Sequence, residues 1–467
     1  MLSRKVGIIA GLSLRFNSTV AQNAVKRVQK DVVIVGGGPA GLSLATALKS
    51  SPIASGLDVT LIEGQSMDRL KGWKDRVTSD KYENRVSSLT PRSVRFLQRI
   101  GAWDHVAQDR VMPYDEMKVW DGVSGSRIEF DPFYDGETTE IAYMIENSNI
   151  QQGLSERLNS LGFNDIHDSA KVTEIRQGNW PTVVLDNGLE IEARLLVGCD
   201  GQQSPVRMFS GIESRGWDYG RFGVVASLDL EYDNSRAVAY QRFLPSGPIA
   251  MLPMPEGHAT LVWSTLPERA KWLQQLEPKA FCAMVNAGFR LEPVDLDYLH
   301  KMDPADTAAI FDEINWRLDN TPIEDEVNNL PVYVENLQEN TRAGFPMRMR
   351  HADTYVEERI ALVGDAAHAT HPLAGQGLNM GQRDVEFLLE ALETAIGRGL
   401  DIGSLMALEP YWKSAYLPNH LKLGVVDKLH ALYSTDFWPV VQLRSVGLSM
   451  VNSSDFLKSL LIRQASN

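Results

Sequence analysis

The chain has 467 residues, 43% of them hydrophobic and 23% charged, a composition typical of a folded globular protein with a large core. A formal net charge of −14 argues against nucleic acid as the main partner, because neutralising phosphates requires a basic surface. Its two cysteines, Cys199 and Cys282, are too few for a disulfide framework or a cysteine-rich metal site, and no apolar run is long enough to span a bilayer.

Residues 1–30 differ in charge from the rest of the chain. They contain six basic residues, and the first acidic residue is Asp31. On a helical wheel their apolar residues share one face and two arginines lie opposite. This pattern predicts a mitochondrial presequence, whose removal would leave a mature protein near −20. A secretory signal with its apolar region at 6–14 is an alternative, but Arg15 follows directly and no A-x-A cleavage site is evident; a disordered terminus is the third reading.

A strand, a glycine-rich turn and a helix follow. Residues 31–35 are mostly β-branched and predict a buried strand, and 42–49 predict a helix. Between them Gly36 permits the tight turn, Gly38 lets the backbone approach a pyrophosphate, and Gly41 lets helix and strand pack closely. The spacing therefore predicts a dinucleotide site, although a glycine-rich turn in an unrelated α/β protein has the same pattern.

A carboxylate completes this unit. A second predicted strand at 59–62 ends in Glu63, 22 residues after Gly41, where an acidic side chain is expected to accept a hydrogen bond from a ribose 2′-hydroxyl. The acidic residue favours NAD or the ADP half of FAD over NADP.

Two later motifs also follow predicted strands. Residues 195–198 predict a strand that runs into Asp200 and Gly201. Residues 360–363 predict another, which enters Gly364, Asp365 and the glycine-rich segment 371–381. The three motifs together, in this order along the chain, resemble those of the aromatic-hydroxylase class of flavin monooxygenases, which includes para-hydroxybenzoate hydroxylase. The resemblance implies an α/β fold in which a Rossmann-type FAD-binding domain is interleaved with an antiparallel-sheet substrate domain.

The resemblance also implies FAD as the cofactor and a set of residues that bind it. Asp365 is expected on the ribityl chain, and Asp200 near the pyrophosphate. A helix that begins near Gly377 would direct its positive end at the flavin pyrimidine. The expected cofactor-binding residues are Gly36, Gly38, Gly41, Glu63, Arg85, Asp200, Gly201, Asp365, Gly375, Gln376, Gly377, Leu378 and Asn379.

One proline and two histidines in the third motif need separate treatment. Pro372 has no N–H and a fixed φ, so it suits a rigid wall beside the flavin; the alternative is an ordinary loop proline. His368 and His371 could suggest a metal pair, but no further ligand stands at suitable spacing, so no metal is expected. No catalytic nucleophile or acid–base residue is assigned.

The middle of the chain predicts antiparallel strands. Short strands are expected at 117–120, 127–130, 183–185 and 189–191, and four extended segments over 222–264. The resemblance makes 222–264 the floor of the substrate domain. Alternation places Gln241 and Phe243 on one face of a strand, where they are the substrate residues expected, although ordinary sheet packing explains either equally well.

These elements give a discontinuous domain organisation. The FAD-binding domain is expected at 31–110, 144–220 and 345–410 and the substrate domain at 111–143 and 221–344. Residues 295–339 contain 12 acidic and two basic residues and are expected as an insertion, either a solvated face or a docking surface. Residues 411–467 are expected to be helical. The part after 421 has a net charge of +2 and apolar faces, which suit either a membrane surface or packing on the FAD domain.

Within this class the chain is most similar to the ubiquinone-biosynthesis hydroxylases, and specifically to the mitochondrial branch that hydroxylates ring position 5. The similarity lies in 84–89, 101–104, 241–253 and 371–381. It implies hydroxylation of a polyprenylated hydroxybenzoate-type precursor by O₂ through a flavin C4a-hydroperoxide, and peripheral attachment to the matrix side of the inner membrane. Ferredoxin with its reductase is the implied electron source, and other ubiquinone-biosynthesis proteins are implied partners.

Two other functions occur on related folds. One is a flavin reductase that saturates polyprenyl chains, and the other is a non-catalytic protein that binds prenylated partners. For the acidic ferredoxin, the sequence predicts a docking surface formed by Arg342, Arg348, Arg350 and Arg359, with a solvated arginine-rich face as the alternative.

Overall fold

The computed structural model describes residues 26–130, 140–233, 236–322, 326–370, 375–454 and 457–458. An eight-stranded sheet forms the core of one half of the molecule, and its main path runs β18–β19–β11–β1–β2–β8. From β19 to β8 these strands are parallel. Their bounds are β1 (Arg27–Val35), β2 (Val59–Ile62), β8 (Ile166–His167), β11 (Glu190–Gly198), β18 (Val356–Glu357) and β19 (Ile360–Leu362). The antiparallel strands β10 (Thr182–Leu185) and β9 (Val172–Arg176) extend the sheet from β11.

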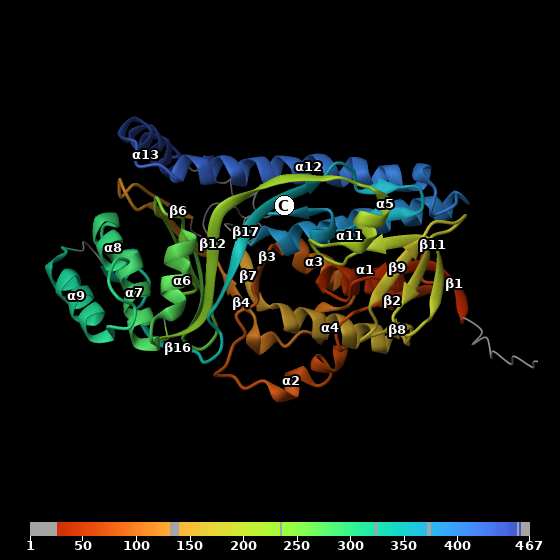
Figure 1. Cartoon of the computed structure of the whole chain (residues 1–467), viewed down its shortest axis with the longest axis horizontal. Coiled ribbons are helices and arrows are strands. Elements are labelled where there is room, and N and C mark those ends of the chain that lie inside the picture. The colour runs from red at the N-terminus through yellow and green to blue at the C-terminus, as the bar shows by residue number, and fades with distance from the viewer. Residues whose placement is uncertain are drawn as a thin grey trace, which may run out of the picture.

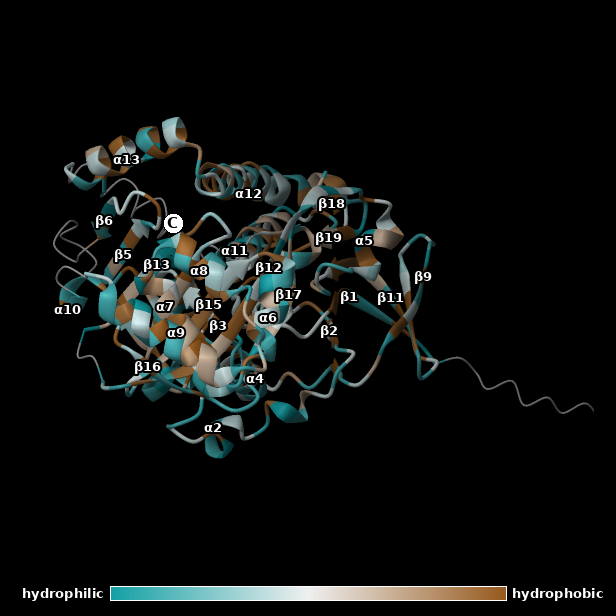
Figure 2. Ribbon diagram, turned by 60° about the vertical axis from the view of Figure 1, so that its left-hand side comes forward, coloured by the Kyte–Doolittle hydropathy of each residue, from teal (hydrophilic) through white to brown (hydrophobic). Residues whose placement is uncertain are grey.

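Helices cover this sheet (Figure 2). The carboxyl-terminal parts of its central strands, 32–35 of β1 and 195–197 of β11, are accordingly continuous, buried apolar runs. The helix α1 packs against both α4 and α11, and α11 packs against α12. The helices of this half are α1 (Pro39–Ser50), α2 (Trp73–Arg76), α3 (Pro91–Arg99), α4 (Asn147–Ser160), α5 (Pro205–Ser210), α11 (Gln376–Gly397) and α12 (Leu405–Tyr433).

A nine-stranded sheet forms the other half, with the path β20–β17–β12–β15–β14–β13–β5–β6 and β16 paired to β12. Its strands are β5 (Glu116–Asp121), β6 (Arg127–Phe130), β12 (Ser214–Leu230), β13 (Val238–Phe243), β14 (Ile249–Met254), β15 (His258–Thr265), β16 (Val334–Leu337), β17 (Ala343–Ala352) and β20 (His368–Ala369). The long strands β12 and β17 run between the two halves of the molecule (Figure 1).

Smaller elements complete the second half. A three-stranded sheet contains β3 (Val86–Leu89), β7 (Ala142–Glu146) and β4 (Met112–Tyr114). The helices are α6 (Pro267–Gln275), α7 (Pro278–Arg290), α8 (Pro293–Leu299), α9 (Thr307–Asn320), α10 (Glu326–Asn329) and, at the C-terminal end, α13 (Trp438–Asn452). No helix among the described residues has the length and apolar character needed to cross a membrane.

Most of the predicted elements are confirmed. The expected strands at 31–35, 59–62, 195–198 and 360–363 coincide with β1, β2, β11 and β19 to within a few residues, and the four segments over 222–264 are β12 to β15. The strand β1 begins at Arg27, so its first four residues fall within the predicted presequence, of which 1–25 lie outside the described residues.

The acidic segment 295–339 is integrated more closely than an insertion suggests. Ile310 and Ile314 of α9 are fully buried in the core cluster that contains α7. Val334 of β16 pairs with Leu230 at the end of β12. The segment therefore contributes the strand β16 and buried apolar helix residues to the second half of the molecule.

Candidate cofactor and active site

The carboxyl ends of β2, β1, β11 and β19 lie side by side at one edge of the first sheet. Backbone hydrogen bonds join them beyond the strands: the N–H of Gly36 donates to Ile62 (2.8 Å), that of Cys199 to Val35 (2.7 Å), and that of Val363 to Gly198 (2.9 Å). Because each of the three predicted motifs begins at one of these ends, all three meet at the edge where open α/β sheets bind their ligands.

Steric contacts explain two glycines of the first motif. Gly36 has a φ of 108°, and a Cβ there would lie 2.3 Å from the carbonyl oxygen of Cys199. A Cβ on Gly41 would lie 1.8 Å from the carbonyl oxygen of Gly36. Gly38 differs, because a Cβ there would meet no atom within 4 Å. It faces open space in front of the N-terminus of α1, where a pyrophosphate would be held by free N–H groups.

Glu63 lies beside this turn. One carboxylate oxygen accepts from the N–H of Gly37 (2.6 Å) and the other from the N–H of Gln65 (2.8 Å), which leaves further lone pairs for a ribose hydroxyl. The sequence analysis missed Gln151 of α4, whose amide nitrogen donates to the carbonyl of Gly37 (3.1 Å). No motif marks Gln151, because it reaches the turn from a helix 114 residues further along the chain.

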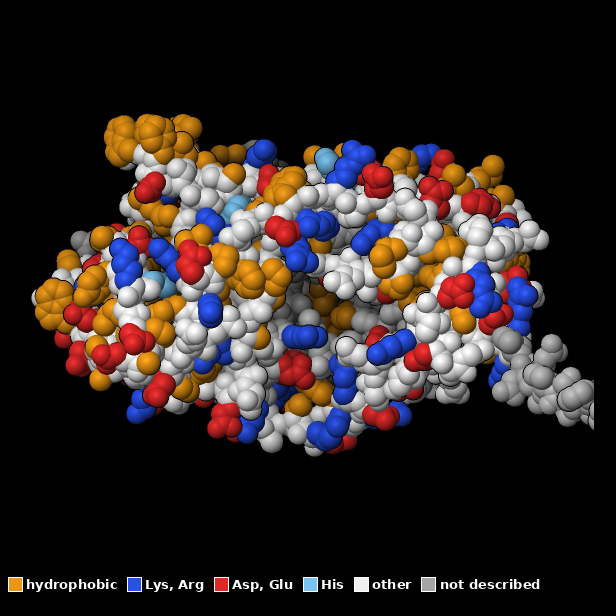
Figure 3. Space-filling view, in the orientation of Figure 1, with side chains coloured by type: hydrophobic (Ala, Val, Ile, Leu, Met, Phe, Trp, Pro, Cys, Tyr) orange, Lys and Arg blue, Asp and Glu red, His pale blue; other side chains and the backbone are white. Residues whose placement is uncertain are grey.

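Asp200 and Asp365 follow β11 and β19 at this edge of the sheet. Burial raises the pKa of Asp200 to about 6, and its Oδ1 atom is buried with no hydrogen-bond partner among the described residues. Burial also raises the pKa of Asp365, although this residue is exposed to solvent. Asp365 is therefore surrounded by protein and still accessible to solvent. The space-filling view shows a hollow near the centre of one face of the molecule (Figure 3).

A second helix N-terminus points into the same region. The helix α11 begins at Gln376, directly after Gly375, which adopts a left-handed φ of 57°. The Cβ position of Gly377 lies 4.0 Å from an Asp365 carboxylate oxygen. The Oε1 atom of Gln376 is buried without a partner among the described residues. The N-termini of α1 and α11 suit anionic groups, and the unpaired oxygens of Asp200 and Gln376 can accept hydrogen bonds from hydroxyl groups. Both properties fit a dinucleotide that carries a sugar alcohol chain, as FAD does.

The expected roles of Pro372, Asn379 and Arg85 at the flavin stay predictions. Pro372 lies in 371–374, outside the described residues. The side chain of Asn379 is buried and turned away, because it donates to the carbonyl of Ser88 (2.7 Å) and accepts from the N–H of Thr90 (2.9 Å). It therefore holds α11 against β3. Arg85 is exposed just before β3, and no described side chain pairs with its guanidinium.

The expected substrate residues lie on one face of β13. The neighbouring Arg242 points the other way and donates to the carbonyl of Gly288 in α7 (3.0 Å). The ring of Phe243 stacks on that of Tyr433 with centroids 4.0 Å apart, so this residue packs against α12. Gln241 is buried, and among the described residues its amide has no hydrogen-bond partner.

His368 forms a buried pair with the carboxylate of Asp384. Its Nε2 atom lies 2.6 Å from Asp384 Oδ2, and both side chains are fully buried. Burial alone would lower the pKa of His368, but Asp384 outweighs it and the pKa is raised. No group of three potential metal ligands occurs in the described part of the chain, and His371 lies outside it.

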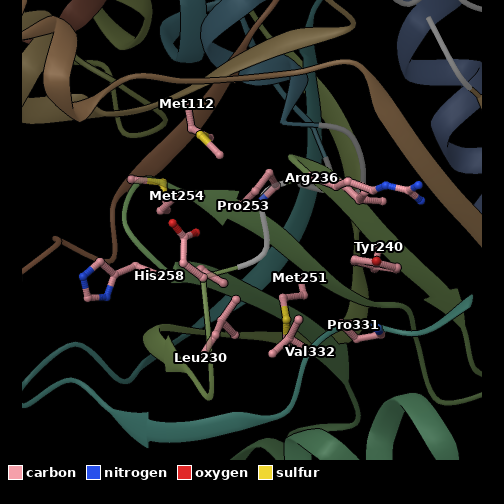
Figure 4. Close-up of a pocket in the computed structure, with 14 residues that line it drawn as sticks. Met112, Leu230, Arg236, Tyr240, Met251, Pro253, Met254, His258, Pro331 and Val332 are labelled. Atoms are coloured by element: carbon pink, nitrogen blue, oxygen red, sulfur yellow. The ribbon is translucent and has the colours of Figure 1, made fainter. Parts of the chain in front are cut away.

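A separate pocket of about 380 Å³ lies at the end of the second sheet (Figure 4). Three methionines from β4 and β14 line it: Met112, Met251 and Met254. Its polar lining includes Arg236 and His258. It includes none of the expected FAD or substrate residues.

The four arginines expected to form one docking surface all have partners within the protein. Arg359 binds Asp401 (2.7 Å) and the carbonyl of Arg194, and Arg342 donates to the carbonyl of Leu273. Arg348 and Arg350 remain together on β17, where both guanidinium groups contact Asp218. Arg348 and Arg350 are the more exposed members of the set, and the docking surface stays a prediction.

Comparisons with known proteins agree with this geometry. The FAD binding domain family matches residues 29–307 and 332–400. The fold is also that of p-nitrophenol 4-monooxygenase PnpA from Pseudomonas putida (TM-score 0.67, 19% identity, 95% of this chain and 99% of that chain). A similar structure is pqsL, a probable FAD-dependent monooxygenase from Pseudomonas aeruginosa (TM-score 0.64, 19% identity, 90% and 99%). Fold and cofactor motifs together define an FAD-dependent monooxygenase, which confirms the predicted fold class and cofactor.

Sequence relatives identify the family. The chain is 42% identical to the mitochondrial ubiquinone biosynthesis monooxygenase COQ6 of Saccharomyces cerevisiae over 99% of this chain and 97% of that protein. It is 40% identical to the COQ6 of Schizosaccharomyces pombe (96% and 94%) and 34% to that of Homo sapiens (93% and 92%). The chain belongs to the COQ6 family of ubiquinone biosynthesis monooxygenases. The reductase and prenyl-binding alternatives are not favoured.

Proposed function

We propose that this chain hydroxylates ring position 5 of a polyprenylated hydroxybenzoate-type precursor of ubiquinone, using O₂. The observation that carries the proposal is that Glu63, Asp200 and Asp365 follow neighbouring strand ends at one edge of the first sheet, in a chain 42% identical to a ubiquinone biosynthesis monooxygenase. The net reaction converts an aromatic C–H and O₂, with two electrons and two protons, into a phenol and water.

The chain's own residues bind and orient the reactants. Bound FAD supplies the activation of O₂ once it is reduced. The N–H groups at the start of α1 would hold the pyrophosphate in front of Gly38, and Glu63 and Asp365 would accept from sugar hydroxyls. The N-terminus of α11 would stabilise negative charge on the flavin. The free amide of Gln241 is suited to bind the phenol oxygen of the substrate.

Electrons come from an acidic ferredoxin and its reductase in this proposal. Arg348 and Arg350 are partly exposed on β17, opposite the exposed Trp217 of β12. Complementary charge raises encounter rates, so this pair and Trp217 form the proposed docking surface. The acidic helix α9 would repel ferredoxin and is free for other ubiquinone-biosynthesis proteins.

Membrane attachment uses the two C-terminal helices. Leu417, Leu421, Val425 and Leu429 form an exposed row along α12, and Lys428 lies beside them. The turn into α13 exposes Phe437 and Trp438, and Figure 3 shows a large apolar surface at α13. Apolar residues on the outside of a helix, with lysine and aromatic rings beside them, suit an anionic leaflet. With a mitochondrial presequence at the N-terminal end, the protein would lie on the matrix side of the inner membrane.

A single-turnover reaction tests the proposed activity. The anaerobically reduced holoenzyme is mixed with O₂ and a 3-prenyl-4-hydroxybenzoate, and the product is characterised by NMR. We expect a hydroxyl group at ring position 5. Hydroxylation at another position would contradict the assigned ring position, and a product with a saturated prenyl chain and an unchanged ring would contradict the hydroxylase function.

A further inference from the structure

A shallow basic pocket lies between α3, α11 and α12. Each helix contributes a cation to its lining: Arg92, Arg383 and Lys422. Glu386 is the one carboxylate among the described residues that line it, and it binds both Arg92 (2.9 Å) and Arg99 (3.0 Å). The lining therefore carries an excess of two positive charges, in a chain whose net charge is −14.

Lys422 is the cation whose charge is least compensated. No described residue forms an ion pair or hydrogen bond with its ammonium group. Burial, followed by the nearby Arg383 and Arg92, lowers the pKa of Lys422 to about 8. A half-buried ammonium group beside two guanidinium groups is unfavourable unless an anion joins them, and an anion there would restore the ordinary pKa.

The pocket borders the apolar row of α12. Lys422 follows Leu421 directly, and it precedes Val425 and Leu429 by three and seven positions, the spacing of one helix side. All three apolar residues are exposed. An anionic group in the pocket would therefore lie next to surface that suits acyl chains.

We propose that Arg92, Arg383 and Lys422 bind the phosphate of an anionic phospholipid headgroup when α12 lies on the membrane. This inference rests on the membrane attachment proposed above and names the lipid that the surface selects. Guanidinium and ammonium groups from three elements can donate to several phosphate oxygens at once. An acidic face of a protein partner is the competing occupant. It is disfavoured because the pocket is small and concave and its neighbours are exposed leucine and valine, which suit lipid better than a charged protein surface.

Acylation of lysines tests the proposal on the holoenzyme. The rates of acetylation at Lys422 and Lys428 are measured near pH 8 by mass spectrometry, with neutral phosphatidylcholine vesicles, with vesicles that also contain phosphatidylglycerol, or with soluble glycerophosphoglycerol. Lys428 is the matched control, since it lies on the exposed side of the same helix and outside the pocket lining. We expect phosphatidylglycerol vesicles to slow acetylation of Lys422 by about fivefold, as for roughly four-fifths occupancy, and neutral vesicles to leave it largely unchanged.

The control separates this inference from membrane attachment itself. If Lys428 is protected by vesicles while Lys422 reacts at the same rate with neutral and anionic vesicles, the headgroup site is wrong and the membrane surface stands. If neither lysine is protected by any vesicle, both proposals fail. Strong protection of Lys422 by soluble glycerophosphoglycerol without vesicles would overturn the membrane as the source of the phosphate. Protection of Lys422 by ferredoxin alone would overturn the anion site in favour of a protein partner.

A substitution pair provides a second readout. Lys422→Gln should weaken binding to phosphatidylglycerol vesicles by about tenfold relative to neutral vesicles, because a charged hydrogen bond is lost. Lys428→Gln removes the same charge and should change this ratio by less than about threefold, as one lysine near an anionic surface contributes modestly. Equal effects of the two substitutions would contradict a defined headgroup site.

Discussion

Arg444 on α13 forms a bidentate ion pair with Asp121 at the end of β5. Its Nε and Nη2 atoms each donate to a different carboxylate oxygen at 2.9 Å, and the two side chains are 1% and 0% exposed. The Nη1 atom also donates to the carbonyl of Leu432 in the last turn of α12 and to that of Thr435, which lies between α12 and α13. The ion pair therefore fixes the C-terminal helices to the nine-stranded sheet, beside the stacked rings of Phe243 and Tyr433.

Replacing Arg444 tests this attachment. Arg444→Met leaves the buried Asp121 carboxylate without its counter-ion and should lower the free energy of unfolding by about 3–5 kcal/mol. The double variant Arg444→Met with Asp121→Asn removes both charges and should recover most of this loss. Urea unfolding followed by tryptophan fluorescence provides the measurement. Additive losses in the double variant would show that the two groups do not depend on each other.

Gly38 tests where the pyrophosphate lies. A Cβ at this position meets no protein atom within 4 Å, so Gly38→Val should fold normally but purify without flavin. Gly56→Val is the matched control, because Gly56 also has open space around its Cβ position and lies away from the cleft. The absorbance near 450 nm, relative to that at 280 nm, gives the flavin content of each variant. A Gly38→Val protein with full flavin content would place the cofactor elsewhere.

Asp200 should make the apoprotein less stable as the pH rises. Burial raises its folded-state pKa to about 6 from an ordinary value of 3.8, so folding favours the protonated carboxyl. This contribution is fully present below about pH 4 and is lost as the pH rises through about 6, with a loss of roughly 2–3 kcal/mol. The unfolding free energy of apoprotein should therefore fall from pH 4 to 7 more steeply than that of Asp200→Asn. Parallel pH profiles for the two proteins would refute the shift.

Ferredoxin should reduce the flavin much faster than NADPH alone. The rate with ferredoxin and its reductase should fall as salt is added, because the proposed contact is between opposite charges. Replacing Arg348 and Arg350 by Glu should slow reduction by about tenfold at low salt, whereas Lys71→Glu, at an exposed lysine outside the proposed docking surface, should leave it unchanged. Stopped-flow absorbance follows the reduction. Rapid stoichiometric reduction by NADPH without ferredoxin would remove the need for this partner.

The FAD motifs were predictable because each lies in a short stretch of chain. The turn at Gly36 to Gly41 needs glycine because its own backbone and that of the neighbouring strand leave no room for a Cβ at two of these positions. The carboxyl ends of parallel strands meet at one sheet edge whatever the length of the loops between them. Contacts between distant segments left no such signal. Gln151 reaches Gly37 from α4, and the arginines at 342 and 359 are used by carbonyls on other elements.

The C-terminal helices show the same limit. Their apolar faces were visible in the sequence, but whether these faced the core or the solvent was left open. The structure buries one side of α12 against α11 and leaves Leu421 and Val425 exposed. The ion pair of Arg444 with Asp121 joins residues separated by 323 positions, so spacing along the chain could not indicate it.

The origin of the oxygen atom tests the central claim most directly. The holoenzyme is supplied with ferredoxin, its reductase and NADPH, together with a prenylated hydroxybenzoate and ¹⁸O₂ in ordinary water. The mass of the product is measured by mass spectrometry. The account predicts one ¹⁸O atom in the phenol product of the wild-type protein and no product from flavin-free Gly38→Val. An unlabelled hydroxyl group in the product, or an active flavin-free protein, would contradict it.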